Sequence, residues 1–128
     1  HRLDGADVDW EAPTTAEEQA DLGRLLKVVR SALDSVSGGP AGIPRLLLTV
    51  TARAGGGLTR KAAAIVDRVH LMAYDDMRDP EAHASMGVAE AQVGIALVEG
   101  VPAPKVVLGV PFYGRAQTGA ARAYRELA

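Results

Sequence analysis

Acidic residues occupy every second position in one short segment near the start of the chain. Asp7, Asp9 and Glu11 alternate with Val8 and Trp10. In a β-strand, alternate side chains share a face, so the three carboxylates would line one face at intervals of about 6.6 Å. Val8 and Trp10 would point the other way, where they can pack beneath a helix. This spacing predicts a row of carboxylates rather than isolated surface charges.

Crowded carboxylates on the inner face of a buried strand repel one another and lose solvation, so they cannot all ionise at low cost. We therefore expect at least one of the three to keep its proton near neutral pH. A carboxyl group that still holds a proton at this pH can act as a general acid. A catalytic set of this kind is expected at the carboxyl end of a strand, where α/β folds place their chemistry.

Two other interpretations of the acidic row stay open. The strand could lie at a sheet edge with a solvated polar face. Alternatively, the residues could begin a calcium-binding loop, with Glu18 as the last of its ligands. The loop would then have Ala12 in place of its turn glycine, followed by Pro13, and it would follow a strand where a calcium-binding loop of this class needs a helix.

The elements that would position these residues form four strand–helix repeats at the spacing of βαβ units, about 30 residues. Thr15 and Glu18 match a capping box at a helix start, and Ser37-Gly-Gly-Pro40 ends that helix. The central strands are continuous apolar runs, as in parallel strands covered on both faces. The fold class is therefore α/β. The expected strands cover residues 3–10, 45–51, 69–74 and 105–110, and the expected helices 15–36, 59–67 and 88–98.

Two further structural expectations follow from local patterns. Val88, Ala91, Ile95 and Val98 are spaced as the inward face of the last helix. The tail at residues 117–128 is Ala-rich and is expected to be weakly helical.

Composition excludes several classes of function. The chain has 128 residues, 48% of them hydrophobic, a net charge of −2 and no cysteine. A disulfide scaffold, a thiolate metal site and a cysteine nucleophile are therefore excluded, as is a nucleic-acid or membrane binder that acts by bulk positive charge. No apolar run reaches membrane-spanning length, and no targeting signal is visible. His1, His70 and His83 lack metal-ligand spacing, and His70 is expected in the interior; we expect no metal site and no cofactor.

Three collinear motifs carry a resemblance to a known family. Asp4, Asp7, Asp9 and Glu11 satisfy the pattern DxxDxDxE. Met72-Ala-Tyr-Asp75 matches MxYD, and Gly109-Val-Pro-Phe-Tyr-Gly-Arg115 matches GxPxYGR. Each motif follows or ends a predicted strand. In this combination the sequence resembles glycoside hydrolase family 18, the chitinases and their relatives.

The resemblance implies a (β/α)8 TIM barrel, a fold that needs about 250 residues. Residues 1–128 would then be a partial catalytic domain of about half a barrel, with strands corresponding to the fourth through seventh. Such a half barrel has two open sheet edges, so we expect the chain alone to self-associate or to be marginally stable, and to be weakly active or inactive.

The resemblance also implies roles for individual residues. Glu11 would be the general acid, Asp9 would orient the substrate's 2-acetamido group, and Asp7 would tune the protonation of Asp9. Tyr74 would donate a hydrogen bond to the acetamide oxygen. Asp4 would support the strand end. The substrate-binding candidates are Met72, Asp75, Trp10, Tyr113 and Arg115.

The function implied is hydrolysis of β-1,4-linked N-acetylglucosamine polymers such as chitin, by substrate-assisted catalysis with retention of configuration. Two alternatives remain: a chitinase-like lectin, and an endo-β-N-acetylglucosaminidase that acts on peptidoglycan or glycans. The expected partners are chitin or N-acetylglucosamine oligosaccharides, with no nucleic acid or membrane. By the same resemblance, the expected location is extracellular.

Overall fold

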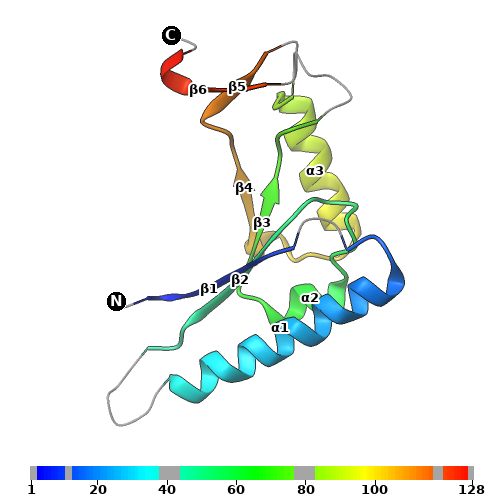
Figure 1. Ribbon diagram of the computed structural model, residues 1–128. Coiled ribbons are helices and arrows are strands. Elements are labelled where there is room, and N and C mark those ends of the chain that lie inside the picture. Colours follow the sequence, from blue (N-terminus) through cyan, green and yellow to red (C-terminus); the bar gives the residue numbers. More distant parts are fainter. Residues whose placement is uncertain (1–2, 11–12, 38–43, 77–82, 117–119, 127–128) are drawn as a thin grey trace.

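The computed structural model describes residues 3–10, 13–37, 44–76, 83–116 and 120–126. Along the chain, strands and helices alternate up to the fourth strand, after which a short hairpin follows (Figure 1). The elements are β1 (Gly5–Asp9), α1 (Ala16–Val36), β2 (Leu47–Ala52), α2 (Arg60–Ile65), β3 (Arg68–Met72), α3 (Met86–Val98), the 3₁₀-helix η2 (Ala103–Lys105), β4 (Val106–Gly109), β5 (Tyr113–Arg115), β6 (Ala121–Ala123) and the 3₁₀-helix η3 (Tyr124–Glu126).

The main sheet has the order β1-β2-β3-β4, and all three pairings are parallel. The predicted α/β class with four parallel strands is confirmed. Because the strands are parallel, their carboxyl ends meet at one edge of the sheet, where Asp9 is the last residue of β1 and Met72 the last of β3. Within the described part of the chain, β1 and β4 each pair with one neighbour in this sheet.

Helix α1 begins as its sequence predicts. Thr15 is the N-cap, its side chain accepts a hydrogen bond from the Glu18 N–H, and the Glu18 carboxylate accepts from the Thr15 N–H at 2.9 Å. That hydrogen bond from the Thr15 backbone is the main reason that the pKa of Glu18 is lowered. The helix ends at Val36 with Ser37 as its C-cap. The capping box therefore fixes where the chain leaves β1 and enters α1.

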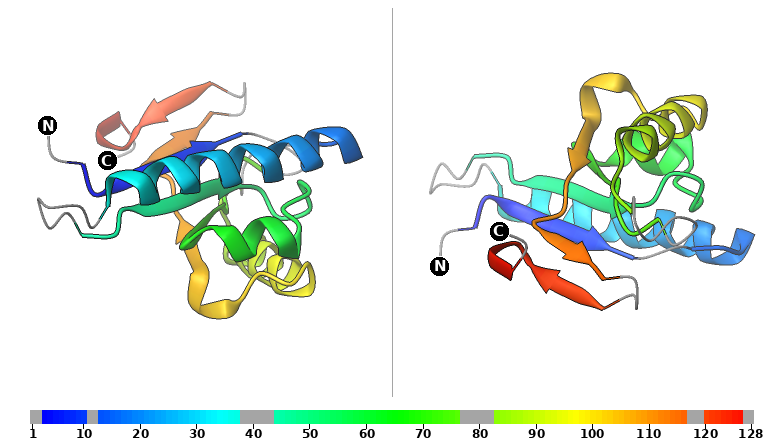
Figure 2. Two further views of the ribbon diagram at one scale, coloured as in Figure 1. Left: turned by 90° about the horizontal axis from the view of Figure 1, so that it is seen from below. Right: turned by 90° about the horizontal axis from the view of Figure 1, so that it is seen from above.

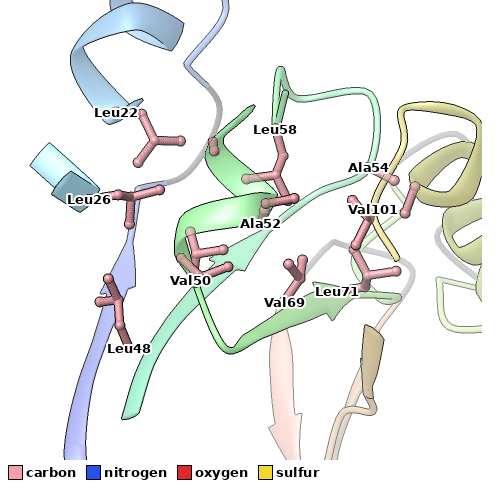
Figure 3. Packing of buried hydrophobic residues seen from close by; sticks show 14 residues of the cluster. Leu22, Leu26, Leu48, Val50, Ala52, Ala54, Leu58, Val69, Leu71 and Val101 are labelled. Atoms are coloured by element: carbon pink, nitrogen blue, oxygen red, sulfur yellow. The ribbon is translucent and has the colours of Figure 1, made fainter. Parts of the chain in front are cut away.

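The hydrophobic core lies between the sheet and the helices on one of its faces (Figure 3). Along β2, Leu48 and Val50 are almost fully buried, whereas Thr49 and Thr51, which alternate with them, are only half-buried. The prediction that these strands are covered on both faces is therefore wrong for β2, whereas at the end of β3 Leu71 and Met72, which point to opposite faces, are both buried. The core side chains come from α1, α2, α3, the strands and their loops: Leu22, Leu26, Leu48, Val50, Ala52, Ala54, Leu58, Ala62, Ala63, Val66, Val69, Leu71, Ala96 and Val101.

One local expectation is wrong, and a second holds only in part. Helix α3 buries Gln92 and Ala96, while Val98 is 89% exposed. Apolar residues of this helix are exposed as well as buried, so their pattern does not single out one face. A tertiary contact selects the buried face, since the Gln92 side chain accepts a hydrogen bond from the Ala54 N–H at 2.8 Å. In the tail, Ala121–Ala123 forms β6, antiparallel to β5, because backbone pairing overrides the helical propensity of alanine. The helical part of the described tail is the single 3₁₀ turn of η3.

The hairpin of β5 and β6 lies on the side of β1 and β2 that is opposite α1 (Figure 2). This is the side toward which the polar residues of β1 and β2 point. We call it the open face. Within the described residues, no helix has the length and apolar character needed to cross a membrane.

Candidate active site

Asp7 is held on the open face by residues of two neighbouring strands. The Thr51 hydroxyl donates a hydrogen bond to Asp7 Oδ2 at 2.8 Å, and the Thr49 hydroxyl donates to Asp7 Oδ1. His70 Nδ1 lies 3.5 Å from Asp7 Oδ1, and its side chain is 38% exposed. The expectation that His70 lies in the interior is therefore wrong for the described part of the chain. Two hydroxyl donors fix the Asp7 carboxylate in one orientation.

Asp9 lies on the same face of β1 as Asp7, and both residues are exposed. The expected burial of this acidic row is therefore wrong at these two positions. Val8 and Trp10 pack against the core on the opposite face, as predicted. This placement gives no support to a sugar contact by Trp10. Glu11, the proposed general acid, lies outside the described residues.

The two alternatives for the acidic row are affected differently. β1 is at the edge of the sheet as described, and its acidic side chains are exposed, as a solvated edge strand requires. Asp7 nevertheless has specific hydroxyl partners in addition to solvent. A calcium-binding loop is disfavoured because the residues before it form a strand instead of a helix. Among the described residues, no group of three or more His, Asp or Glu side chains is arranged to hold a metal ion.

A second cluster surrounds Asp75, three residues beyond the end of β3. The Tyr113 hydroxyl donates a hydrogen bond to Asp75 Oδ2 at 2.7 Å, and Arg115 Nε donates to Oδ1 at 2.6 Å. His83 Nδ1 lies 3.4 Å from Asp75 Oδ1. The structure thus brings together Asp75, Tyr113 and Arg115, which belong to two motifs separated by more than thirty residues along the chain.

The electrostatics of the cluster follow from these contacts. The hydrogen bond from Arg115 is the main cause that lowers the pKa of Asp75 to about 2. Burial, together with the hydrogen bond to Asp75, raises the pKa of Tyr113 to about 12, and the bond to Asp75 also raises the pKa of Arg115. At neutral pH the cluster therefore consists of a carboxylate, a neutral phenol and a guanidinium.

Tyr74 and Met72 connect this cluster to β3. Met72 is buried, and the Tyr74 ring meets the Tyr113 ring edge-to-face, with 6.3 Å between the centroids. Gly109 lies beside them on β4. A Cβ atom at this position would be 3.3 Å from the Tyr74 ring and 2.9 Å from the Leu71 carbonyl oxygen. The glycine of the GxPxYGR pattern therefore leaves room for the tyrosine of MxYD.

In addition to the hydroxyl partners of Asp7, sequence reasoning missed two residues next to Asp75. Arg53, which follows β2, donates a hydrogen bond to the Tyr74 carbonyl oxygen at 2.8 Å. Arg53 and Asp75 also line one surface pocket together. His83 is buried and stacks on Tyr113. Neither residue belongs to a recognisable motif. The one available signal was position, because Arg53 directly follows the carboxyl end of a strand.

Comparison with known proteins identifies the family. The model of the glycosyl hydrolases family 18 matches residues 1–127. Chitinase 1 of Aphanocladium album is 34% identical over 133 residues, which cover 88% of this chain and 31% of that protein. Chitinase A1 of Niallia circulans is 34% identical over 158 residues, covering 96% of this chain and 22% of that protein.

Solved structures agree with these matches. The class V chitinase from Nicotiana tobaccum superimposes with a TM-score of 0.75 at 27% identity, covering 96% of this chain and 47% of that one. A mutant of that chitinase in complex with NAG4 gives a TM-score of 0.76 at 26% identity, with the same coverage. The chain thus spans about a third or less of these two curated relatives and about half of these solved chains. Its four parallel strands are part of the TIM barrel of this family, and the chain belongs to the glycosyl hydrolases family 18.

Proposed function

We propose that this chain supplies the catalytic segment of an enzyme that hydrolyses β-1,4-linked N-acetylglucosamine polymers. The observation that carries the proposal is the arrangement of its motifs. Asp7 and Asp9 line the open face of β1, and the cluster of Asp75, Tyr113 and Arg115 follows the carboxyl ends of β3 and β4. The relatives named as chitinases, and the NAG4 complex of one of them, support the choice of substrate.

In the proposed mechanism, Glu11 protonates the glycosidic oxygen as the leaving group departs. The substrate's own acetamide oxygen attacks the anomeric carbon, so that no enzyme nucleophile is needed and a cyclic oxazolinium ion forms. Water, which gives its proton to Glu11, then attacks the same carbon from the opposite side and releases the acetamide, so that two inversions retain the configuration. Asp9 orients the acetamide and stabilises the positive charge that develops on it. The hydrogen bonds from Thr49 and Thr51 hold the Asp7 carboxyl group in one orientation on the same face of β1 as Asp9, which supports a role for Asp7 in tuning the protonation of Asp9.

The remaining residues bind sugar in this proposal. Tyr74 donates a hydrogen bond to the acetamide oxygen, and Met72 and Asp75 line the same subsite. The Tyr113 hydroxyl, whose hydrogen is donated to Asp75, accepts a hydrogen bond from a sugar hydroxyl, and Arg115 contacts the sugar beside it. Their positions after β3 and on β5 support these roles, since α/β barrels place their active sites at the carboxyl ends of the strands.

Replacing Glu11 by Gln in the full-length protein tests the proposal. Loss of a general acid lowers turnover by about 10²–10⁴-fold, so we expect hydrolysis of chito-oligosaccharides to fall by that factor while folding is retained. Glu90→Gln is the matched control, because Glu90 is an exposed residue of α3; its turnover should equal that of the original protein. Near-normal turnover by Glu11→Gln would remove Glu11 from its role.

The same assays distinguish the alternatives. If the original protein binds chitin but releases no soluble sugar, it is a lectin instead of a hydrolase. If it releases sugar from peptidoglycan or protein-linked glycans and not from chitin, it is an endo-β-N-acetylglucosaminidase. We also propose an extracellular location, where a polymeric substrate is accessible; fractionation of the producing cells with an antibody against the protein tests it.

A further inference from the structure

The backbone at Asp75 adopts a conformation that needs support from its surroundings. Among the described residues, Asp75 is the one non-glycine residue with a positive φ, at 58°. Residues with a Cβ atom rarely adopt this left-handed conformation, and where it occurs at a functional site the surrounding structure holds it in place. The direction of the Asp75 carboxylate depends on this turn.

His83 provides acceptors for two successive N–H groups of the turn. Its Nδ1 atom accepts a long hydrogen bond of 3.4 Å from the Asp75 N–H, and its carbonyl oxygen accepts from the Asp76 N–H at 3.1 Å. One residue thus links the backbone on both sides of the Asp75 Cα atom to the segment that leads into α3.

His83 is itself fixed by packing. It is 8% exposed, and its ring stacks on Tyr113 with 5.7 Å between centroids and 22° between planes. Tyr113 donates to the same carboxylate that His83 Nδ1 approaches at 3.4 Å. The imidazole therefore contacts both the turn and the phenol that binds its carboxylate.

We propose that His83 is a positioning residue, which holds the left-handed Asp75 turn and thereby sets the direction in which Asp75 and Tyr113 face a bound sugar. The part of this inference that concerns the sugar rests on the proposed function. The part that concerns the Asp75 backbone depends only on the contacts of His83.

Two substitutions separate the imidazole nitrogen from the bulk of the ring. His83→Phe keeps a flat ring against Tyr113 and removes Nδ1, whereas His83→Asn keeps a polar acceptor near the position of Nδ1 and removes the ring. Val66→Ala is the control for general destabilisation, because Val66 is a buried core residue next to the amino end of β3. Thermal unfolding of each variant establishes that it folds.

The first readout is hydrogen exchange of the Asp75 amide, measured by NMR. We expect exchange to be about fivefold faster in His83→Phe, as for one lost hydrogen bond, and to return part of the way in His83→Asn. In Val66→Ala, the exchange rate of the Asp75 amide should rise no more than the exchange rates of the β2 amides. Equal exchange in His83→Phe and the original protein, or equal acceleration in Val66→Ala, would overturn the inference.

The second readout is the kinetics of chito-oligosaccharide hydrolysis by the full-length protein. We expect His83→Phe to raise KM by about fivefold, the scale of one hydrogen bond, with little change in kcat. An unchanged KM would overturn the inference that His83 sets the direction in which Asp75 and Tyr113 face the sugar. If the original protein hydrolyses no chito-oligosaccharide, the proposed function fails, and the exchange experiment still decides whether His83 holds the turn.

Discussion

Two aspartates near opposite ends of β3 each form the centre of a polar cluster, and the clusters differ in what they connect. Asp67, just before the strand, accepts from the Leu48 N–H at 2.9 Å, from Arg30 at 3.2 Å and from Arg45 at 2.6 Å. Asp75, beyond the strand, has Tyr113 and Arg115 as its donors. Their side chains are similarly exposed, at 20% and 22%.

The backbone distinguishes the two positions. The backbone of Asp67 is not in the left-handed region. Its side chain pairs with Arg30 of α1, and its own N–H donates to the Leu48 carbonyl oxygen of β2 at 2.7 Å. Asp75 has a left-handed backbone, and its partners come from the hairpin strand β5. In barrels of parallel strands the amino ends maintain stability and the carboxyl ends carry chemistry. We therefore propose that the Asp67 cluster maintains the fold and that the Asp75 cluster binds sugar.

The largest effect is expected from Asp67→Asn, on stability. Arg30 is buried and would lose a charged partner, which costs about 3 kcal/mol of unfolding free energy. Urea unfolding measures this loss, and turnover per folded molecule should stay the same. Asp34→Asn is the control, since Asp34 also pairs with Arg30 but is more than half exposed; its cost should be below about 1 kcal/mol. Equal costs for both variants would contradict a special role for Asp67.

Asp75→Asn should lower the activity per folded molecule, which Asp67→Asn should not. The variant keeps an oxygen acceptor but loses the negative charge that binds Arg115, so the specificity constant kcat/KM for chito-oligosaccharides should fall about thirtyfold. The measurement is steady-state kinetics corrected for the folded fraction. If activity fell only in proportion to the folded fraction, Asp75 would be a structural residue like Asp67.

Stability in acid should also depend on Asp75. Its pKa is about 2 in the folded protein, below the ordinary value of 3.8, because the folded state favours the charged form. The resulting stabilisation is present above about pH 4 and is lost as the pH falls to about 2, and it amounts to about 2 kcal/mol. Urea unfolding from pH 5 to pH 2 should therefore show a smaller acid loss in Asp75→Asn. Parallel curves for the two proteins would contradict the lowered pKa.

The pKa of Asp67 is also lowered, but by a different set of contacts. Burial raises its pKa, but the hydrogen bond from the Leu48 N–H and the contacts with Arg45 and Arg30 outweigh this effect. Asp67→Asn should therefore also lose less stability in acid than the original protein, without any change in the acid dependence of sugar binding.

The smallest effect is expected from Lys105→Met at the amino side of the sheet. Lys105 Nζ donates to the carbonyl oxygens of Ala63 at 3.0 Å and Val66 at 2.7 Å, at the end of α2. Methionine keeps most of the side-chain volume but makes neither bond, so the unfolding free energy should fall by about 1 kcal/mol. Urea unfolding measures the change. A fall in turnover per folded molecule of Lys105→Met would contradict the proposal that the amino edge of the sheet serves stability and the carboxyl edge serves binding.

Local signals in the sequence predicted the elements well. The Thr15–Glu18 capping box and the four apolar strands were confirmed, since each depends on residues close together in the chain. The three motifs also led to the correct family. These features need no knowledge of which strands are neighbours.

Features that depend on distant neighbours were not predicted. The exposure of Asp7 and Asp9 depends on what covers the open face, which the residues of β1 do not encode. The buried face of α3 is selected by the hydrogen bond between Gln92 and Ala54, and His83 gains its role from contacts with Asp75 and Tyr113. No local periodicity contains these long-range contacts.

The central claim is that sugar binds at the carboxyl edge of the sheet and not at the amino edge. NMR of full-length Glu11→Gln protein, titrated with a β-1,4-linked N-acetylglucosamine tetramer, tests it most directly. We predict that the amide signals of Asp9, Asp75 and Arg115 shift with the sugar while those of Asp67 and Lys105 do not. Shifts concentrated around Asp67 and Lys105, or no shifts at any sugar concentration, would contradict the account.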